Sequence, residues 1–464
     1  MIYQNEDQLK EGCQSILDWR EGDVRILDER SFQEELIDDL IYTAVFSPDS
    51  VIQEAAAFLI RRGAARLGII PASIQSLYEA MGKGEVSGFT VPAINIRGLT
   101  YDVAQAVFRA AKKGDAGPVI FEIARSEIGY TRQRPLEYAC AVLAAAIKTG
   151  WRGPVFLQGD HFQINAKKFA AEGERETQAV RDLIREAILA SFYNIDIDTS
   201  TLVDLSHPTI KDQQRMNFTL AAELTALIRG LEPEGITVSV GGEIGEVGGK
   251  NSTVEELQAF MDGYLEELER RGPTLKGISK ISVQTGTTHG GVPLADGTVA
   301  KVKIDFEVLQ KLSETARARY GLAGAVQHGA STLPDEAFDR FPATQTAEIH
   351  LATGFQNIIY DSKSFPGRLR AKVYDHLRSE LKGEWKEKDT EEQFIYKTRK
   401  KGFGPFKQEL WELSADVRDE ICAELEGKFA FLFDKLKING TRQLLDRFVK
   451  PVDVPLERPA ALKG

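Results

Sequence analysis

Three histidines follow segments that are predicted to be buried β-strands, and imidazole is a common ligand of transition metals. They are His161, His289 and His328. In a closed barrel of parallel strands, the carboxyl ends of all strands lie on one rim, so these three side chains can converge on one point. Three neutral imidazoles that leave a fourth position open form a catalytic zinc site. The alternative is that each histidine is only a hydrogen-bonded rim residue, an explanation that suits one histidine better than three.

Asp160 lies directly before His161, at the end of the apolar run 155–159. A run of this length, opened by Gly153-Pro154, is typical of a strand buried on both faces of a parallel sheet. Because adjacent strand residues point to opposite sides, Asp160 and His161 can share a site only if the strand ends there. A carboxylate in this place can transfer a proton without itself holding the metal.

Small residues follow two of the histidines. Gly290-Gly291 comes after His289, and Gly329-Ala330-Ser331 comes after His328. Such loops are often simple turns, but their free backbone N–H groups also bind phosphate at the mouth of a barrel. Beside a metal site, they predict a substrate whose phosphate group lies next to the zinc ion.

Strand and helix patterns alternate through the middle of the chain. Strands are predicted at 89–95, 118–123, 155–159, 194–199, 236–241, 277–283, 324–327 and 348–352. Helices are predicted at 101–113, 136–149, 174–191, 210–231, 254–271 and 306–320. Eight such units in one chain predict an α/β fold, a (β/α)8 TIM barrel over residues 86–362, with a doubly wound sheet as the alternative. Residues 1–85 and 363–464 are predicted to be N-terminal and C-terminal helical extensions.

Composition narrows the class of protein. The chain has 464 residues, a net charge of −11 and three widely spaced cysteines. The charge argues against a nucleic-acid or anionic-membrane partner, and the cysteines argue against a disulfide framework or a thiolate zinc site. Neither a signal peptide nor an apolar run of about 20 residues, the length a membrane helix needs, is recognisable. A cytoplasmic protein is therefore expected.

Taken together, the motifs resemble those of the zinc-dependent class II fructose-bisphosphate and tagatose-bisphosphate aldolases. The resemblance covers residues 86–362 and rests on five motifs: Gly159-Asp160-His161, Gly242-Glu243-Ile244-Gly245, Gly286-Thr287-Thr288-His289-Gly290, His328-Gly329-Ala330-Ser331 and Ile349-His350-Leu351-Ala352-Thr353. It implies that Asp160 is the catalytic acid/base and that Zn²⁺ is the cofactor. The implied zinc ligands are His161, His289 and His328, with Glu243 as an alternative ligand.

The resemblance also implies a set of substrate contacts. Those that would bind the ketose phosphate are Gly290, Gly329, Ser331 and Thr353, while Asn95 and His350 would lie close to the sugar. Asp198 matches an acidic residue beside the metal. The implied substrate is a phosphorylated sugar, the implied assembly is a homodimer or larger homo-oligomer, and a monovalent cation that assists phosphate binding remains open.

Two departures from the family pattern affect the predicted chemistry. Where the family carries acidic residues on a loop that moves the carbanion proton, this chain has Lys250-Asn251. Where the family usually has an asparagine that contacts the ketose, this chain has His350, and where the family often has an aspartate, it has Ala352. Three functions therefore compete: an aldolase for fructose 1,6-bisphosphate, a related zinc lyase for a tagatose-type or single-phosphate sugar, and a non-catalytic partner subunit of an aldolase.

Overall fold

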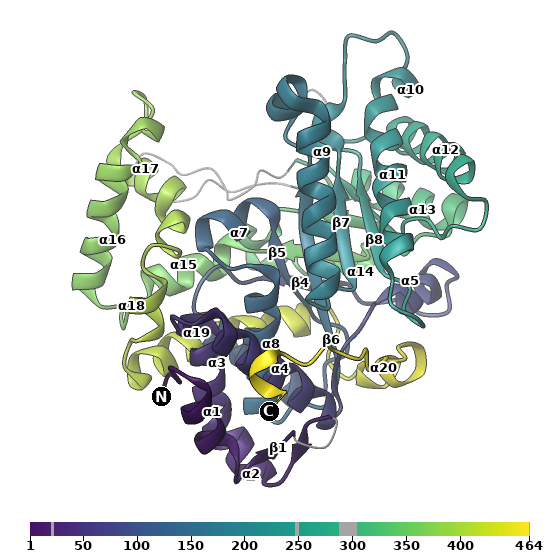
Figure 1. The fold of residues 1–464 in the computed structure, drawn as a ribbon. Coiled ribbons are helices and arrows are strands. Elements are labelled where there is room, and N and C mark those ends of the chain that lie inside the picture. Colours follow the sequence, from purple (N-terminus) through teal and green to yellow (C-terminus); the bar gives the residue numbers. More distant parts are fainter. Residues whose placement is uncertain (20–22, 246–249, 287–303, 464) are drawn as a thin grey trace.

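Eight parallel strands close into a barrel in this computed structural model (Figure 1), which describes residues 1–19, 23–245, 250–286 and 304–463. Each strand pairs with the next one along the chain, and the last pairs with the first. The strands are β4 (Val91–Asn95), β5 (Ile120–Ala124), β6 (Gly153–Gln163), β7 (Asn194–Asp198), β8 (Ser239–Glu243), β9 (Lys280–Val283), β10 (Ala325–Gln327) and β11 (Glu348–Leu351). The predicted TIM barrel is confirmed, and the doubly wound alternative is wrong.

One strand that was not predicted joins the outside of this sheet. It is β3 (Ile69–Pro71), which pairs in parallel with the beginning of β6. It lies in the segment predicted to be a purely helical extension, and it ties that segment to the barrel through backbone hydrogen bonds.

Helices surround the barrel, and the longer ones bury one apolar face. Those between the strands are α6 (Thr100–Gly114), α7 (Arg125–Thr131), α8 (Pro135–Lys148), α9 (Ala166–Leu189), α10 (Ile210–Gln213), α11 (Arg215–Leu231), α12 (Val254–Arg271), α13 (Phe306–Tyr320) and α14 (Arg340–Ala343), and α15 (Thr353–Asp361) follows β11. Local sequence sets their ends. For example, Thr253 and Glu256 form a reciprocal capping box that satisfies two free N–H groups at the start of α12.

Before the barrel, the N-terminal part of the chain contains α1 (Glu6–Cys13), α2 (Glu29–Ser31), α3 (Ile37–Phe46), α4 (Ser50–Arg66), α5 (Gln75–Gly82) and a short hairpin of β1 (Leu17–Asp18) and β2 (Arg25–Ile26). The helices α3 and α4 pack against each other and against α8 (Figure 1). They therefore cover the outer layer of the barrel on that side.

After the barrel come α16 (Gly367–Glu380), α17 (Glu391–Thr398), α18 (Lys407–Trp411), α19 (Ala415–Lys435) and α20 (Arg442–Phe448). The helix α19 packs along α6, and the 3₁₀ turn Arg399–Gly402 packs against α7. Extra helices at both ends are thus present, while the exact domain limits remain a prediction. Among the described residues, none of the helices combines the length and the apolar character that a membrane crossing needs.

Candidate active site

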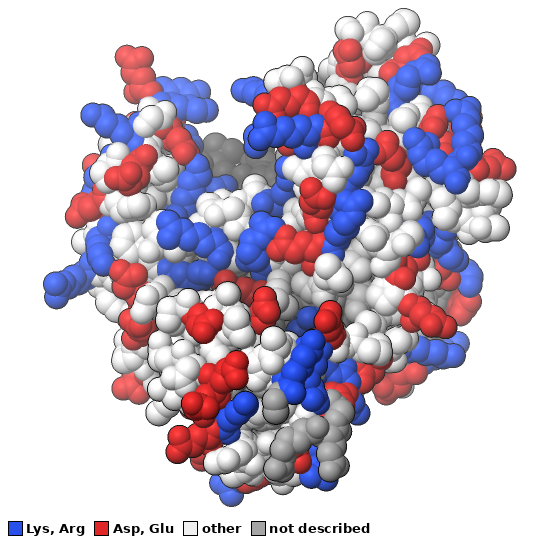
Figure 2. Space-filling view, in the orientation of Figure 1, with Lys and Arg blue, Asp and Glu red and all other residues white. Residues whose placement is uncertain are grey.

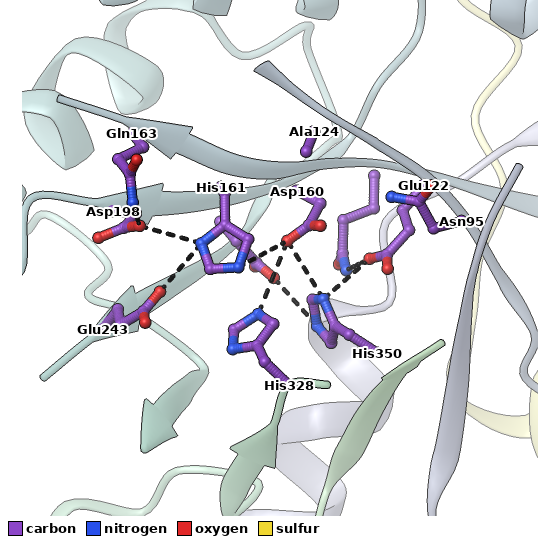
Figure 3. Close-up of polar contacts among 12 residues, drawn as sticks. Asn95, Glu122, Ala124, Asp160, His161, Gln163, Asp198, Glu243, His328 and His350 are labelled. Carbon is purple, nitrogen blue, oxygen red and sulfur yellow. Dashed lines mark hydrogen bonds and ion pairs between the residues drawn. The ribbon is translucent and has the colours of Figure 1, made fainter. Parts of the chain in front are cut away.

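Most of the predicted site residues surround one cavity of about 580 Å³. The residues that line it include Asn95, Asp160, His161, His328, Gly329, Ser331, His350 and Thr353. Glu243 does not line it, but its carboxylate lies 3.2 Å from Nδ1 of His161. His289 and Gly290 lie outside the described residues. The structure therefore brings together side chains from β4, β6, β10 and β11, as expected for the rim of one barrel (Figure 3).

Asp160 and His161 share the site for a different reason from the one predicted. The strand does not end at these residues, because β6 continues to Gln163. Instead, the register against β7 shifts between Gly159 and Phe162, and His161 has a φ of +41°. A bulge of this kind turns a side chain away from its regular direction. Both side chains can therefore reach the cavity from adjacent positions of a continuous strand.

Two carboxylates lie close to one ring nitrogen of His161. Its Nδ1 lies 2.9 Å from Oδ2 of Asp198 and 3.2 Å from the carboxylate of Glu243. Burial and the Asp198 carboxylate raise the pKa of Glu243 to about 7, whereas hydrogen bonds from His161, Ser200 and Gln163 outweigh burial and lower the pKa of Asp198 to about 2. Asp198 therefore stays ionised and orients the imidazole ring.

The ring of His328 lies beside that of His161, with the two ring centroids 4.2 Å apart. Burial lowers the pKa of His328 well below its usual value, and the nearby imidazoles of His161 and His350 lower it further. A neutral imidazole is the form that binds a metal ion. Asp160, His161 and His328 form one group with metal-ligand spacing, and His161, Asp198 and Glu243 form a second. We call these five residues the metal-side group.

Asp160 occupies the centre of the site and is only 5% exposed. Its Oδ1 lies 3.2 Å from Nδ1 of His350, 3.6 Å from Nε2 of His328 and 3.8 Å from Nε2 of His161. Burial raises the pKa of this carboxyl, but the imidazoles of His161 and His350 outweigh burial and hold the pKa well below its usual value. Asp160 is therefore a carboxylate that can accept a proton from a bound substrate.

A second set of charged side chains lies deeper in the barrel. The imidazole of His350 lies between them: Nδ1 is 3.1 Å from Glu122 and Nε2 is 2.7 Å from Glu348. Nζ of Lys280 donates to Asp196 at 2.9 Å, to Gln158 at 2.8 Å and to Glu348. We call the five ionisable residues the floor group: Glu122, Asp196, Lys280, Glu348 and His350.

Local sequence makes room for this buried lysine. Gly241 lies on β8 between Asp196 on β7 and Lys280 on β9. A Cβ atom at position 241 would lie 2.3 Å from the Asp196 carboxylate and 3.0 Å from Cε of Lys280. Glycine at this position is therefore required for the close approach of the two side chains.

Charge within the floor group is nearly balanced. Burial raises the pKa of Glu122 well above its usual value and also raises that of Asp196, although Lys280 and His350 oppose the shift of Asp196. Burial also raises that of Glu348, but Lys280 and His350 reverse the effect and lower it. Lys280 and His350 remain cationic, because carboxylates outweigh the effect of burial and raise the pKa of each. Two cations thus face the carboxylates of Glu348 and Asp160.

The predicted phosphate-binding residues meet at one side of the cavity. Gly329 has a φ of +68°, in the left-handed region where glycine is favoured. Oγ of Ser331 accepts a hydrogen bond of 3.1 Å from the backbone N–H of Gly354, at the start of α15. Oγ1 of Thr353 lies 3.3 Å from the Arg97 guanidinium. Backbone N–H groups, hydroxyls and a cation are the groups that bind phosphate in proteins.

Sequence reasoning missed several charged residues at the cavity. Arg97 is paired with Glu127, Arg125 is paired with Glu176, and Lys400 reaches the cavity from the 3₁₀ turn of the C-terminal part. Figure 2 shows Lys and Arg side chains on both sides of the hollow between α17 and α9. Burial and the charge of Arg97 lower the pKa of Lys400. A signal was present only for the floor group, where charged residues interrupt apolar strands.

A family model described as fructose-bisphosphate aldolase class-II matches residues 75–402. No curated protein matches the chain. Among solved structures, a probable tagatose 6 phosphate kinase from Sinorhizobium meliloti 1021 aligns with a TM-score of 0.54 and 18% identity, over 81% of this chain and 96% of that one. A fructose-bisphosphate aldolase from Campylobacter jejuni aligns with a TM-score of 0.47 and 17% identity, over 80% and 96% of the two chains.

Proposed function

Because the chain belongs to the class II fructose-bisphosphate aldolase family, we propose that it catalyses the metal-dependent cleavage and formation of a phosphorylated ketose. The proposed substrate is fructose 1,6-bisphosphate, and the products are dihydroxyacetone phosphate and glyceraldehyde 3-phosphate. One observation carries the proposal: a buried carboxylate, Asp160, lies among imidazoles in a cavity that also contains a phosphate-type loop. An aldol cleavage needs these parts within reach of one substrate.

Zn²⁺ is the proposed cofactor, and the donor groups present fit such an ion. His161 and His328 would hold it, with Glu243 as a further ligand and His289, outside the described residues, as the third histidine. The second nitrogen of His161 is fixed by Asp198, as is usual for a metal-binding histidine. When bound, the metal supplies Lewis-acid stabilisation of the negative charge that develops on the ketose oxygens.

Asp160 is proposed to remove the proton from the hydroxyl group at which the carbon–carbon bond breaks. Its pKa is held low by two imidazoles, so it is ionised and ready to accept that proton. Once the proton arrives, the hydrogen bond between Asp160 and His350 fixes the protonated carboxyl in place. In the reverse direction the same group returns the proton to the aldehyde oxygen.

Gly329, Ser331 and Thr353 are proposed to bind the phosphate of the ketose fragment, together with Gly290. Asn95 is proposed to contact the sugar, since it lies at the end of β4 and lines the same cavity. Arg97 adds a positive charge next to Thr353, at 3.3 Å from its hydroxyl. Such fixed contacts hold the reacting carbons in place relative to Asp160.

A different sugar is the second candidate, and His350 favours it. An imidazole held by Glu122, Asp160 and Glu348 presents a charge where the family has an amide. A tagatose-type or single-phosphate ketose would then be the substrate of the same reaction. The third function, a non-catalytic partner subunit, is less well supported, because Asp160, His161 and His328 are all present and lie together.

The test is an assay of purified protein with fructose 1,6-bisphosphate, the tagatose isomer and single-phosphate ketoses, each with and without a chelator. Triose phosphate formation and zinc content are measured on the same samples. We expect chelator-sensitive cleavage of one of these sugars and about one zinc ion per chain. Bound zinc without cleavage of any of them would reject the proposed reaction, and the absence of both would support a partner subunit.

A further inference from the structure

Aldol cleavage moves two protons, and Asp160 accounts for only one of them. Asp160 takes the proton of the hydroxyl group, while the carbanion left on the ketose fragment must receive another at carbon. This second transfer needs an acid whose proton can reach the reacting carbon. The loop where the family carries acidic residues has Lys250-Asn251 here, and Lys250 is exposed. The existence of this second proton donor rests on the proposed function, and the donor must lie in the same cavity.

Only a few described carboxyl groups line the cavity besides Asp160. Glu127 accepts hydrogen bonds from Arg97, from the amide of Asn95 and from the backbone of Ala124. Glu176 is paired with Arg125 and also accepts from the backbone of Asn165. Both groups are thus paired with a guanidinium, and their oxygens already accept hydrogen bonds. A substrate would have to compete with these partners for either group.

The remaining carboxyl is Glu122, and its surroundings differ. It lies on β5, opposite Asn95 of β4 in the sheet register, and its side chain is fully buried. Oε2 accepts a 3.0 Å hydrogen bond from Gln158 and lies 3.1 Å from Nδ1 of His350. Oε1 has no hydrogen-bond partner among the described residues. A buried carboxyl oxygen without a partner, in a residue that lines the cavity, has capacity left for a ligand.

We propose that Glu122 is the second proton-transfer group of the reaction, which protonates the carbanion carbon in cleavage and removes that proton in condensation. Glu122 shares one imidazole nitrogen with Asp160, because Nδ1 of His350 lies 3.1 Å from the first carboxyl and 3.2 Å from the second. The two carboxyls therefore flank the same part of the cavity (Figure 3). They approach a bound ketose from the floor of the barrel.

The protonation states agree with this division of work. Burial raises the pKa of Glu122 well above its usual value, and the charges of Asp160 and Glu348 add to this effect, while His350 and Gln158 oppose it. A proton on Glu122 is therefore favoured. A carboxyl whose pKa is raised by burial commonly serves as the acid in such a reaction.

The atoms balance over one cleavage. Asp160 accepts the hydroxyl proton, the carbon–carbon bond breaks, and its electron pair remains on the ketose fragment. The proton of Glu122 then forms the new C–H bond, which leaves Glu122 as a carboxylate. One carboxyl has gained a proton and the other has lost one, so exchange of one proton between them or with water restores both groups and requires no further reactant.

The decisive experiment follows the C–H proton separately from the bond cleavage. Wild-type holoenzyme is incubated with dihydroxyacetone phosphate in D₂O, and NMR measures exchange of its hydroxymethyl hydrogen. We expect Glu122→Gln to slow this exchange at least about 100-fold, with zinc content unchanged. In the cleavage direction the variant should still form the carbanion, so hexacyanoferrate(III), which oxidises it, should accelerate aldehyde release.

Controls separate proton transfer from structural damage. Glu137→Gln removes a carboxyl that is half-buried against Lys407 outside the cavity, and it should leave exchange unchanged. Glu122→Asp keeps an acid with a shorter reach and should restore part of the exchange. If Glu122→Gln exchanges within threefold of wild type, or loses exchange and carbanion oxidation together, the role of Glu122 is wrong. A wild-type enzyme that neither exchanges nor cleaves any ketose phosphate would reject the proposed function itself.

Discussion

The metal-side group and the floor group are both built from Asp, Glu and His, but only the floor group also contains a lysine. In the metal-side group, Asp160, Asp198 and Glu243 surround His161, while His328 is held neutral. In the floor group, the Lys280 ammonium already contacts Asp196 and Glu348. Groups with metal-ligand spacing occur in both. The floor group thus already contains the ammonium of Lys280, whereas the three carboxyls of the metal-side group have no Lys or Arg partner within the group and could be neutralised by a divalent cation.

Loss of a metal-side ligand should have the largest effect. His328→Ala is expected to lose zinc and to reduce kcat/KM on the order of 1,000-fold or more, because metal stabilisation of the developing charge contributes several kcal/mol. Metal analysis and the cleavage assay on the same preparation check this. If the variant still binds a full equivalent of zinc, His328 is not a metal ligand and the metal-side group has been assigned wrongly.

Substitution at the boundary between the groups comes next. Asp160→Asn should keep zinc and fold normally but lose about 10²–10⁴-fold in kcat, because an amide cannot accept the hydroxyl proton. KM should change much less than kcat, since phosphate binding does not involve this residue. Steady-state kinetics with parallel zinc determination tests the prediction, and turnover within a few-fold of wild type would contradict it.

Substitution in the floor group should lower the free energy of unfolding. Lys280→Met leaves the buried carboxyls of Asp196 and Glu348 without their cation, and breaking such a pair costs about 3–5 kcal/mol in the free energy of unfolding. Urea unfolding measures the loss. The double variant Lys280→Met with Glu348→Gln removes the surplus charge and should recover part of it. Equal stability of wild type and Lys280→Met would show that the floor charges are not coupled.

The contrast between the two groups also explains what could be read from the sequence. Residues of the metal-side group follow strands in short motifs, so His161 and His328 are visible as a pattern at strand ends. Glu122, Lys280 and Glu348 stand alone inside apolar strands, and their partners come from other strands far along the chain. The eight strands themselves were predictable from local apolar runs. The bulge in β6 was not, because it depends on register against β7.

A smaller effect is expected at the mouth of the cavity. Lys400 lines the cavity near Arg97, whereas its neighbour Lys401 is paired with Glu384. Lys400→Gln should therefore raise KM for a phosphorylated substrate about tenfold, the loss of one hydrogen bond to a charged group. Lys401→Gln is the matched control and should leave KM unchanged. Equal effects of both substitutions on KM would mean that Lys400 acts only through general surface charge.

The smallest effect is expected at the loop that departs from the family pattern. If the floor group supplies the carbanion proton, Lys250→Ala should change both kcat and proton exchange less than about twofold. Lys250 is exposed and does not line the cavity, so its removal disturbs no buried charge. Exchange of the dihydroxyacetone phosphate hydrogen in D₂O provides the measurement, with Glu122→Gln as the reference. A large loss of exchange in Lys250→Ala would show that the loop, and not Glu122, supplies the second proton. The floor group would then have a purely structural role.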